Sequence, residues 1–322
     1  MNSVMAWFKT YLLQIVVLLV VVISMYAINP NFHVEASVER LIPLGVISAG
    51  LAVTMIAGEF DLSIASMAAF AGALTIVLSP MGLMLATIIA IVVGILLGML
   101  QGLAIARLGI NSLVFTVGTL ILLRGMTWLI TGGVTVSGND FKEAKVFALK
   151  IGFMTTLSLT AIIVIILLGI FLSRSKWGRE IYALGGARHE AVAAGVRYTR
   201  GMIIAFGISG GAGALGGALV SARGNSAAPN ALEAMLVGAL AVVLVGGISI
   251  AGGKGTMVNV FLGFAIIAIL QSGLAAKGAK AFVSELFVGV LLLVVVLLDY
   301  LIASIAERGR KKKLRTQALL TA

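Results

Sequence analysis

Apolar stretches of about twenty residues follow one another along almost the whole chain, from residue 11 to residue 304. A helix that crosses a bilayer needs about 17 to 25 apolar residues, and lipid offers no partner for an unpaired backbone group. Hydrophobic residues make up 61% of the 322 residues and charged residues only 11%, which is too few to cover a soluble fold of this size. The chain is therefore predicted to be an integral membrane protein.

Ten stretches have the length of a membrane span. They are residues 11–28, 41–57, 62–80, 83–106, 112–131, 151–172, 202–220, 234–250, 257–275 and 285–304. An even number of spans returns the chain to its starting side, and five spans in each half require the second half to enter the membrane in the opposite sense. We expect an all-α polytopic membrane protein with about ten transmembrane helices in two inverted five-helix halves, forming a single transmembrane domain over residues 1–322.

The net charge of +11 is concentrated in two basic clusters. They comprise Arg174, Lys176, Arg179, Arg188, Arg197 and Arg200 in the middle, and Arg308, Arg310, Lys311, Lys312, Lys313 and Arg315 near the end. Both clusters flank apolar segments and lack interleaved aromatic residues for stacking on bases, so they indicate cytoplasmic flanks and not nucleic-acid binding. We therefore expect the cytoplasmic side of the membrane to hold the N-terminus, the segment 173–200 and the tail 305–322. The opposite, outer side is expected to hold the connections 29–40, 132–150, 221–233 and 276–284.

Several familiar chemical motifs are excluded. A formal GxGxxG pattern at Gly211, Gly213 and Gly216 lies within a membrane helix, where glycines favour helix packing over dinucleotide binding. The sequence AGGKGT, from Ala251 to Thr256, lacks the P-loop spacing and is expected to form a tight turn. The chain has no cysteine and only two distant histidines. We therefore expect no catalytic residues, no metal site and no cofactor.

The distribution of charges along the spans limits the transport mechanism. All twelve acidic residues fall in loops or near helix ends on this topology, which disfavours a proton-driven carrier. Arg124 lies about a dozen residues into the fifth span, where an unpaired charge costs roughly 2.5–3.5 kcal/mol. It is expected to face a polar cavity, a helix end or a carboxylate, or else to snorkel toward the outer surface.

The central basic segment, from Ser173 to Val196, contains signals for two short helices. After a break at Trp177–Gly178, residues 179–184 are expected to form one helical turn that ends at Gly185–Gly186. A second helix is expected over 188–194, with Gly195 in a C-cap position. Its small side chains would let a partner lie close, although a solvated loop that only obeys the charge rule is the alternative.

Four stretches together resemble the permease subunits of bacterial ATP-binding-cassette importers for monosaccharides of the ribose, xylose, arabinose and galactofuranose type. They are Gly58–Gly72, which is similar to the family pattern GGIDLSVGS, Phe115–Gly133, Gly178–Val196 and Val243–Gly263. Two departures lie in the first stretch, where Glu59 replaces a Gly and Phe60 an Ile, and Ala187 stands where Asn is common. The departure at Glu59 affects the expected substrate more than the expected function.

The resemblance implies a coupling segment that receives motion from a separate ATPase. Its residues here are Arg179, Gly185, Gly186, Glu190, Ala191, Ala194 and Gly195. The resemblance further implies a polar path for the sugar, for which the candidate residues are Asp61, Ser63, Ser66, Thr116, Thr119 and Arg124. If the segment Gly58–Ser66 re-enters the membrane, Asp61 and Arg124 would pair across the cavity.

The implied assembly contains two cytoplasmic ATP-binding subunits, a second permease copy or a paralogue, and a periplasmic substrate-binding protein. The chain itself would be a non-enzymatic conduit in the bacterial inner membrane that works by alternating access. One alternative is a secondary carrier for a small polar solute, which would be expected to show a deep coupling acid or an ion site made by broken helices. Another is a membrane scaffold, which would not need Arg124 or Asp61 inside the bilayer.

Overall fold

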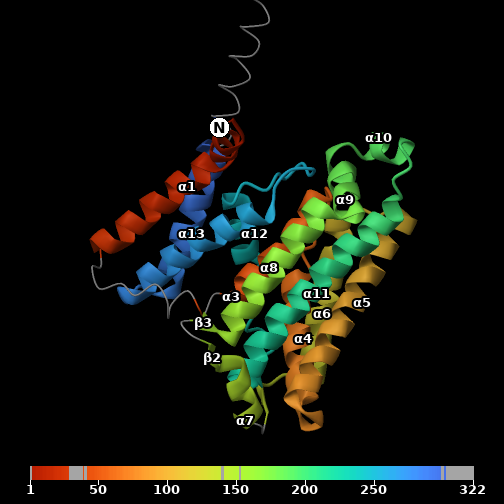
Figure 1. The fold of residues 1–322 in the computed structure, drawn as a ribbon. Coiled ribbons are helices and arrows are strands. Elements are labelled where there is room, and N and C mark those ends of the chain that lie inside the picture. Colours follow the sequence, from red (N-terminus) through yellow and green to blue (C-terminus); the bar gives the residue numbers. More distant parts are fainter. Residues whose placement is uncertain are drawn as a thin grey trace, which may run out of the picture.

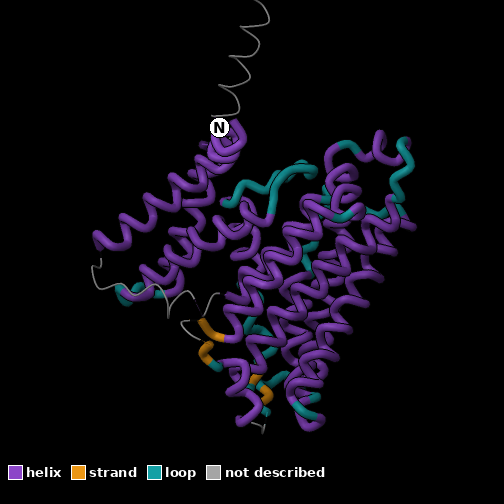
Figure 2. Tube along the Cα trace, in the orientation of Figure 1, coloured by secondary structure: helices purple, strands orange, loops and turns teal. Residues whose placement is uncertain are grey.

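The computed structural model describes residues 2–28, 39, 42–138, 141–151, 154–298 and 301, with the side chains of the first helix described from Tyr11 onward. Helices dominate these residues (Figures 1 and 2). The long or apolar helices are α1 (Asn2–Ile28), α3 (Ile42–Ile56), α4 (Ile64–Val77), α5 (Leu83–Leu108), α6 (Ser112–Thr131), α8 (Thr156–Arg174), α11 (Tyr198–Gly224), α12 (Met235–Val245), α13 (Met257–Ala276) and a helix over Ala281–Leu298.

Short elements fill the connections. They are η1 (Ser79–Met81), α7 (Phe141–Ala144), η2 (Lys145–Ala148), α9 (Lys176–Gly186), α10 (Arg188–Ala193) and the strands β1 (Val136–Ser137), β2 (Lys150–Ile151), β3 (Met154–Thr155) and β4 (Ser226–Ala227). Strand β1 pairs antiparallel with β4, with Val136 opposite Ala227, and β2 pairs antiparallel with β3. The β1–β4 pair joins two of the connections expected outside.

The all-α class is confirmed, and each of the ten expected segments coincides with a helix. Seven helices in the described residues are long and apolar enough to cross a membrane, whereas α3, α4 and α12 have 15, 14 and 11 residues. At about 1.5 Å per residue, a 15-residue helix spans only about 22 Å of a hydrocarbon core that is about 30 Å thick. The count of ten full spans is therefore not confirmed.

Helix α11 packs at the centre of the bundle, against α5, α4 and α3. Glycines set these contacts: a Cβ at Gly98 of α5 would lie 3.2 Å from the Cα of Gly210, and one at Gly213 of α11 would lie 2.9 Å from the carbonyl oxygen of Ile64. Side chains would force these backbones apart, so the glycines permit the close approach. The expectation that Gly211, Gly213 and Gly216 favour helix packing is thus confirmed.

In Figure 1, α1 begins at the same end of the molecule as α9 and α10. This arrangement agrees with the expectation that the N-terminus and the segment 173–200 share one side of the membrane. The C-terminal tail and Asn139, which was expected outside, lie outside the described residues.

Single-cysteine variants of this cysteine-free chain test the sidedness. Ala187, between α9 and α10, and Asn230, in the connection before α12, are both exposed, whereas Asn225 of the same connection is buried and would report poorly. We expect an impermeant thiol reagent to label Asn230→Cys in intact spheroplasts and to label Ala187→Cys only after the membrane is opened. Labelling of Ala187→Cys in intact spheroplasts would contradict the topology.

Candidate functional site

The connection between α3 and α4, residues 57–63, is buried in the bundle and is held by polar contacts. The carboxylate of Asp61, 1% exposed, accepts hydrogen bonds from the backbone N–H of Ser63 at 3.0 Å, from the Ser63 hydroxyl at 2.6 Å and from the Ser209 hydroxyl of α11 at 2.7 Å. The side-chain amide of Gln101 on α5 donates to the Ser63 Oγ at 2.9 Å. Asp61 therefore fixes this connection to two neighbouring helices.

The same connection is also held to α6. The backbone N–H groups of Phe60 and Leu62 donate to the Ser112 Oγ and the Thr116 Oγ1, each at 3.2 Å. The first turn of α6 thus supplies acceptors for a segment that has no helical partners of its own.

The depth of Asp61 corrects one expectation. Gln101 lies seven residues before the end of α5 at Leu108, which is about 10 Å along the helix. Asp61 lies in a connection, as expected. Its partner Ser63 contacts Gln101, so Asp61 lies at a similar depth, and it is almost completely buried. A carboxylate does therefore lie inside the helical bundle, because the shortness of α3 and α4 allows their connection to enter it.

The central basic segment forms the two expected short helices. The Ser175 hydroxyl caps α9 by accepting from the backbone N–H of Gly178 at 2.8 Å, so α9 begins at Lys176 and runs through Trp177. The expected break at Trp177–Gly178 is therefore wrong, since the break lies at the capping serine. Helix α10 ends as expected, with Gly195 at a φ of 89°. Glu190 lies on its exposed face and the exposed Ala194 follows as its C-cap, while Ala191 is buried beneath it.

A charged contact joins α10 to the α3–α4 connection. The Arg188 guanidinium donates to the Glu59 carboxylate, and the Tyr198 hydroxyl at the start of α11 donates to the same oxygen at 3.0 Å. The guanidinium also lies over the Tyr198 ring, 4.8 Å from its centre. Glu59 is only 7% exposed, so its charge depends on these two partners.

A junction of three backbones lies beside this contact. The carbonyl oxygen of Ile56, at the end of α3, accepts from the backbone N–H of Gly253 at 2.9 Å. Gly185 of α9 packs against both groups: an added Cβ there would overlap the Ile56 oxygen and lie 2.6 Å from the Gly253 nitrogen. The sequence AGGKGT forms the expected tight turn between α12 and α13, and this turn supplies the third backbone of the junction.

Two side-chain bonds also tie α9 to the bundle. Arg200 of α11 donates to both carboxylate oxygens of Glu180 at 2.6 Å. The Tyr182 hydroxyl donates to the carbonyl oxygen of Gly255 at 2.6 Å. Helix α9 is thus attached to α3, α11 and the α12–α13 turn together.

Arg124 has a different partner from the one expected. Its Nε lies 2.8 Å from a carboxylate oxygen of Glu233, in the connection before α12. The expectation that Arg124 faces a carboxylate is confirmed, but its pairing with Asp61 is wrong. Among the other pathway candidates, Thr116 lies with Asp61 and Ser63, whereas the Thr119 hydroxyl donates to its own helix at the Phe115 oxygen.

The sequence alone did not identify Gln101, Ser209 or the Glu59–Arg188 pair. Gln101 and Ser209 are isolated polar residues in apolar spans, and this isolation was a usable signal for a buried polar cluster. In the described part of the chain, no group of three or more His, Asp or Glu side chains is placed to hold a metal ion.

These features define a multi-pass membrane protein with an apolar bundle and a charged pair of short helices attached to a buried polar connection. The family described as the permease component of branched-chain amino acid transport systems matches residues 34–296, and the chain belongs to this family. No solved structure matches the chain.

Curated relatives cover most of the chain. The ribose import permease protein of Bacillus subtilis strain 168 is 30% identical over 88% of this chain and 90% of its own length. The protein of the same name from Escherichia coli K12 is 27% identical over 90% of this chain and 95% of its own length. The L-arabinose transport system permease protein of Escherichia coli K12 is 30% identical over 89% of each chain.

Proposed function

We propose that this chain is the transmembrane permease subunit of an ATP-binding-cassette importer and that it translocates a monosaccharide. Relatives named for ribose import and for arabinose and allose transport align with 85–90% of the chain, which supports a sugar as the substrate. The permease works with two ATP-binding subunits, a second permease chain and a periplasmic binding protein. It is a single transmembrane domain in the bacterial inner membrane, with both termini cytoplasmic and no catalytic residues of its own.

The attachment of α9 and α10 to the α3–α4 connection carries the proposed mechanism. The ATPase docks on the exposed face of α10, which carries Glu190, Ala194 and Gly195. Its movement passes through Arg188 to Glu59 and through Gly185 to the end of α3, as a rigid-body shift of packed elements. Asp61 lies two residues beyond Glu59, so the same movement reaches the polar contacts inside the bundle.

The sugar path is proposed to run beside these contacts. Asp61, Ser63 and Thr116 lie together and are closed to solvent in this conformation, so they meet the substrate only when the α3–α4 connection moves. Ser66, Thr119 and Arg124 stay on the list of proposed path residues, and the exposed Arg124–Glu233 pair would stand at its outer end.

Buried Asp61 is the one observation that favours a secondary carrier. A coupling carboxylate must exchange a proton or bind an ion during transport. The Asp61 carboxylate, however, is occupied by three donors from Ser63 and Ser209, which suits a fixed structural contact better. The sugar-import relatives add to the case for the ATP-driven importer.

The docking face of α10 supplies the test of this function. Glu190→Lys and Ala194→Trp change exposed side chains without touching the attachments of α9, so the chain should still fold and insert. We expect each variant to reduce co-purification of the ATPase and sugar uptake by at least about tenfold, because contact residues of this kind contribute about 2 kcal/mol.

The matched control is Lys277→Glu, an exposed charge change in the connection after α13 at the opposite side of the membrane. It should retain the ATPase and normal uptake. If the two α10 variants behave like this control, α10 is only a charged flank and the docking assignment is wrong.

A further inference from the structure

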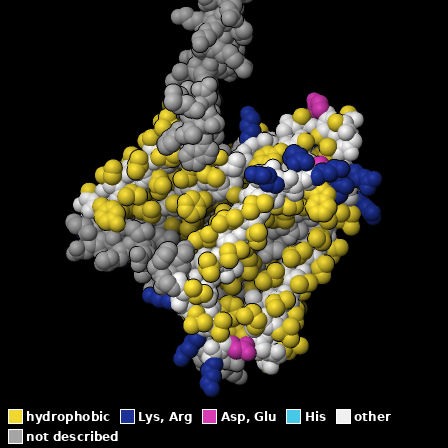
Figure 3. All heavy atoms as spheres, in the orientation of Figure 1, with side chains coloured by type: hydrophobic (Ala, Val, Ile, Leu, Met, Phe, Trp, Pro, Cys, Tyr) yellow, Lys and Arg dark blue, Asp and Glu magenta, His cyan; other side chains and the backbone are white. Residues whose placement is uncertain are grey.

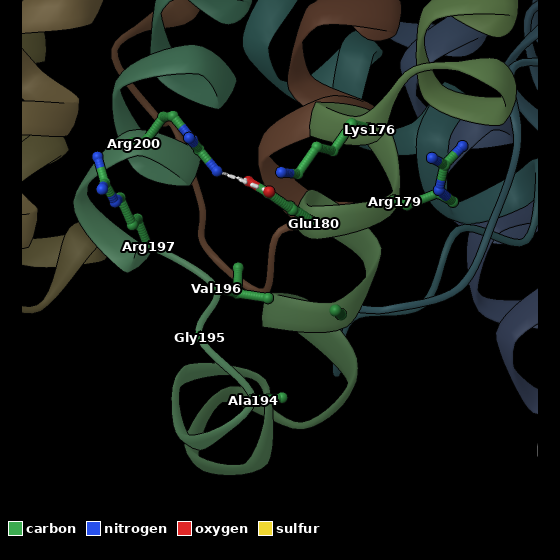
Figure 4. Close-up of a pocket in the computed structure, with 9 residues that line it drawn as sticks. Lys176, Arg179, Glu180, Ala194, Gly195, Val196, Arg197 and Arg200 are labelled. Carbon is green, nitrogen blue, oxygen red and sulfur yellow. Dashed lines mark hydrogen bonds and ion pairs between the residues drawn. The ribbon is translucent and has the colours of Figure 1, made fainter.

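One face of α9, the start of α11 and the link formed by Ala194, Gly195 and Val196 line an open basic pocket of about 610 Å³. Lys176, Arg179, Arg197 and Arg200 line it together with the carboxylate of Glu180, so its net charge is +3. In Figure 4 the ends of Lys176 and Arg200 point toward Glu180, whereas Arg179 and Arg197 point away from it. The pocket thus presents a cationic opening where α8 and α11 leave the membrane-spanning bundle.

One hydrogen-bond donor of Arg200, beside this pocket, has no partner among the described residues. One of its terminal nitrogens contacts both oxygens of Glu180, while its buried Nε–H has no hydrogen-bond partner among the described residues. A buried donor without an acceptor is unfavourable. That donor is buried, however, so an anion in the pocket would meet the exposed side chains of Lys176 and Arg197 and the overall positive charge.

An apolar groove of about 540 Å³ lies between α5, α8 and α11. Its lining includes Met99 of α5, Phe171 of α8, Trp177 of α9, and Ile204 and Ile208 of α11. Helix α8 packs against α3, α9 and α13, and α11 packs against α5, α4 and α3, so the groove follows the space between two sets of helices.

The groove and the basic pocket adjoin each other along α9 and α11. Arg200, Ile204 and Ile208 follow one another at four-residue spacing and share a face of α11. On α9, Lys176 of the pocket is directly followed by Trp177 of the groove. Figure 3 shows the Lys and Arg side chains gathered at the end that carries α9 and α10, above an apolar surface. The pocket is therefore the charged end of the groove.

We propose that the pocket and groove together form a binding site for an anionic glycerophospholipid of the membrane leaflet on the α9–α10 side. The phosphate contacts the exposed side chains of Lys176 and Arg197, and an acyl chain lies in the groove. Any lipid can place an acyl chain in the groove, but only an anionic headgroup matches the charge of +3 in the adjoining pocket. The bound lipid bridges α9 and α11 beside Ala194 and Gly195, so its place next to the ATPase docking face rests on the proposed function, whereas the lipid binding itself can be measured without the ATPase.

Trp177 supplies a direct reporter for this site. The chain has three tryptophans, so the full chain with Trp7→Phe and Trp128→Phe leaves Trp177 as the only emitter. This chain is reconstituted in phosphatidylcholine vesicles that contain brominated phosphatidylglycerol or, in parallel, brominated phosphatidylcholine. We expect the brominated phosphatidylglycerol to quench Trp177 at severalfold lower mole fraction, because its anionic headgroup concentrates it at the site.

Charge variants locate the headgroup. Lys176→Gln with Arg197→Gln should reduce the preference for phosphatidylglycerol at least about fivefold, since each basic side chain near an anionic surface contributes a factor of about that size. Lys254→Gln, an exposed charge in the α12–α13 turn that does not line the pocket, should keep the preference.

Three results would overturn the proposal. Equal quenching by the two lipids in the chain with its basic residues intact would show that the site does not select an anion. If the double charge variant kept its preference for phosphatidylglycerol, that preference would come from the general surface charge of the chain and not from this pocket. Weak quenching by both lipids would mean that protein, such as a second copy of the chain, covers the groove. The first and third comparisons need no charge variant, so a folding defect in that variant leaves the test intact.

Discussion

Gly185→Ala is expected to abolish ATP-driven uptake, although the change adds a single methyl group. The new Cβ would overlap the carbonyl oxygen of Ile56, which already accepts a hydrogen bond from the backbone of Gly253. All three neighbours are backbone, so no flexible side chain can give way. Overpacking of this kind costs about 1–3 kcal/mol, and here relief comes only by moving α9 away from α3. The path from the docking helices to the bundle would then be broken.

Gly186→Ala is the matched control, because an added Cβ there would meet only the Gly253 Cα, at 3.9 Å. We expect this variant to keep most of its uptake and Gly185→Ala to lose at least about nine-tenths, measured in proteoliposomes with equal amounts of inserted protein. ATP hydrolysis should continue with Gly185→Ala but become independent of the sugar. Similar uptake by the two variants would show that the three-backbone junction does not transmit motion.

Asp61→Leu is expected to reduce both thermal stability and uptake. The substitution leaves the buried donors of Ser63 and Ser209 without an acceptor, at about 1–3 kcal/mol for each unsatisfied group. Asp61→Asn keeps one acceptor oxygen in the same position, so we expect a smaller loss on both measures. A fall in stability of the purified chain would identify Asp61 as a contact that holds α4 to α11.

Thr87→Val controls for the removal of a buried hydroxyl, since Thr87 bonds only to the carbonyl oxygen of Leu83 in its own helix. This variant should melt and transport like the parent chain. If Asp61→Leu melts normally but loses uptake, Asp61 acts on the substrate or on an ion and not as a structural contact. If Asp61→Leu melts and transports normally, the carboxylate has neither role.

The positions of the helices could be predicted from the sequence because lipid requires every backbone group to be bonded within its own helix. Their lengths could not be predicted as well. Apolar residues continue beyond the end of α12, so composition does not reveal that this helix stops before Gly247, which lies at a positive φ. The shortness of α3 and α4 is what allows the polar connection between them to lie inside the bundle.

The two short helices of the central segment could also be predicted, because a C-cap glycine such as Gly195 ends a helix through its effect on neighbouring residues. The contacts between distant segments were not. Glu59 and Arg188 are 129 residues apart, and Arg124 and Glu233 more than a hundred, and nothing in the spacing of their charges selects these partners. Glu59 was noted as a departure from the family pattern, but only the fold reveals the arginine that it contacts.

ATP-driven uptake by the reconstituted complex tests the central claim most directly. The chain is placed in proteoliposomes with its ATPase subunits, and labelled ribose and arabinose are offered with the binding protein on the opposite side. We predict uptake that requires ATP, the ATPase and the binding protein together, and none when an ion gradient replaces ATP. Uptake by the chain alone, driven by an ion gradient, would contradict the assignment and identify a secondary carrier.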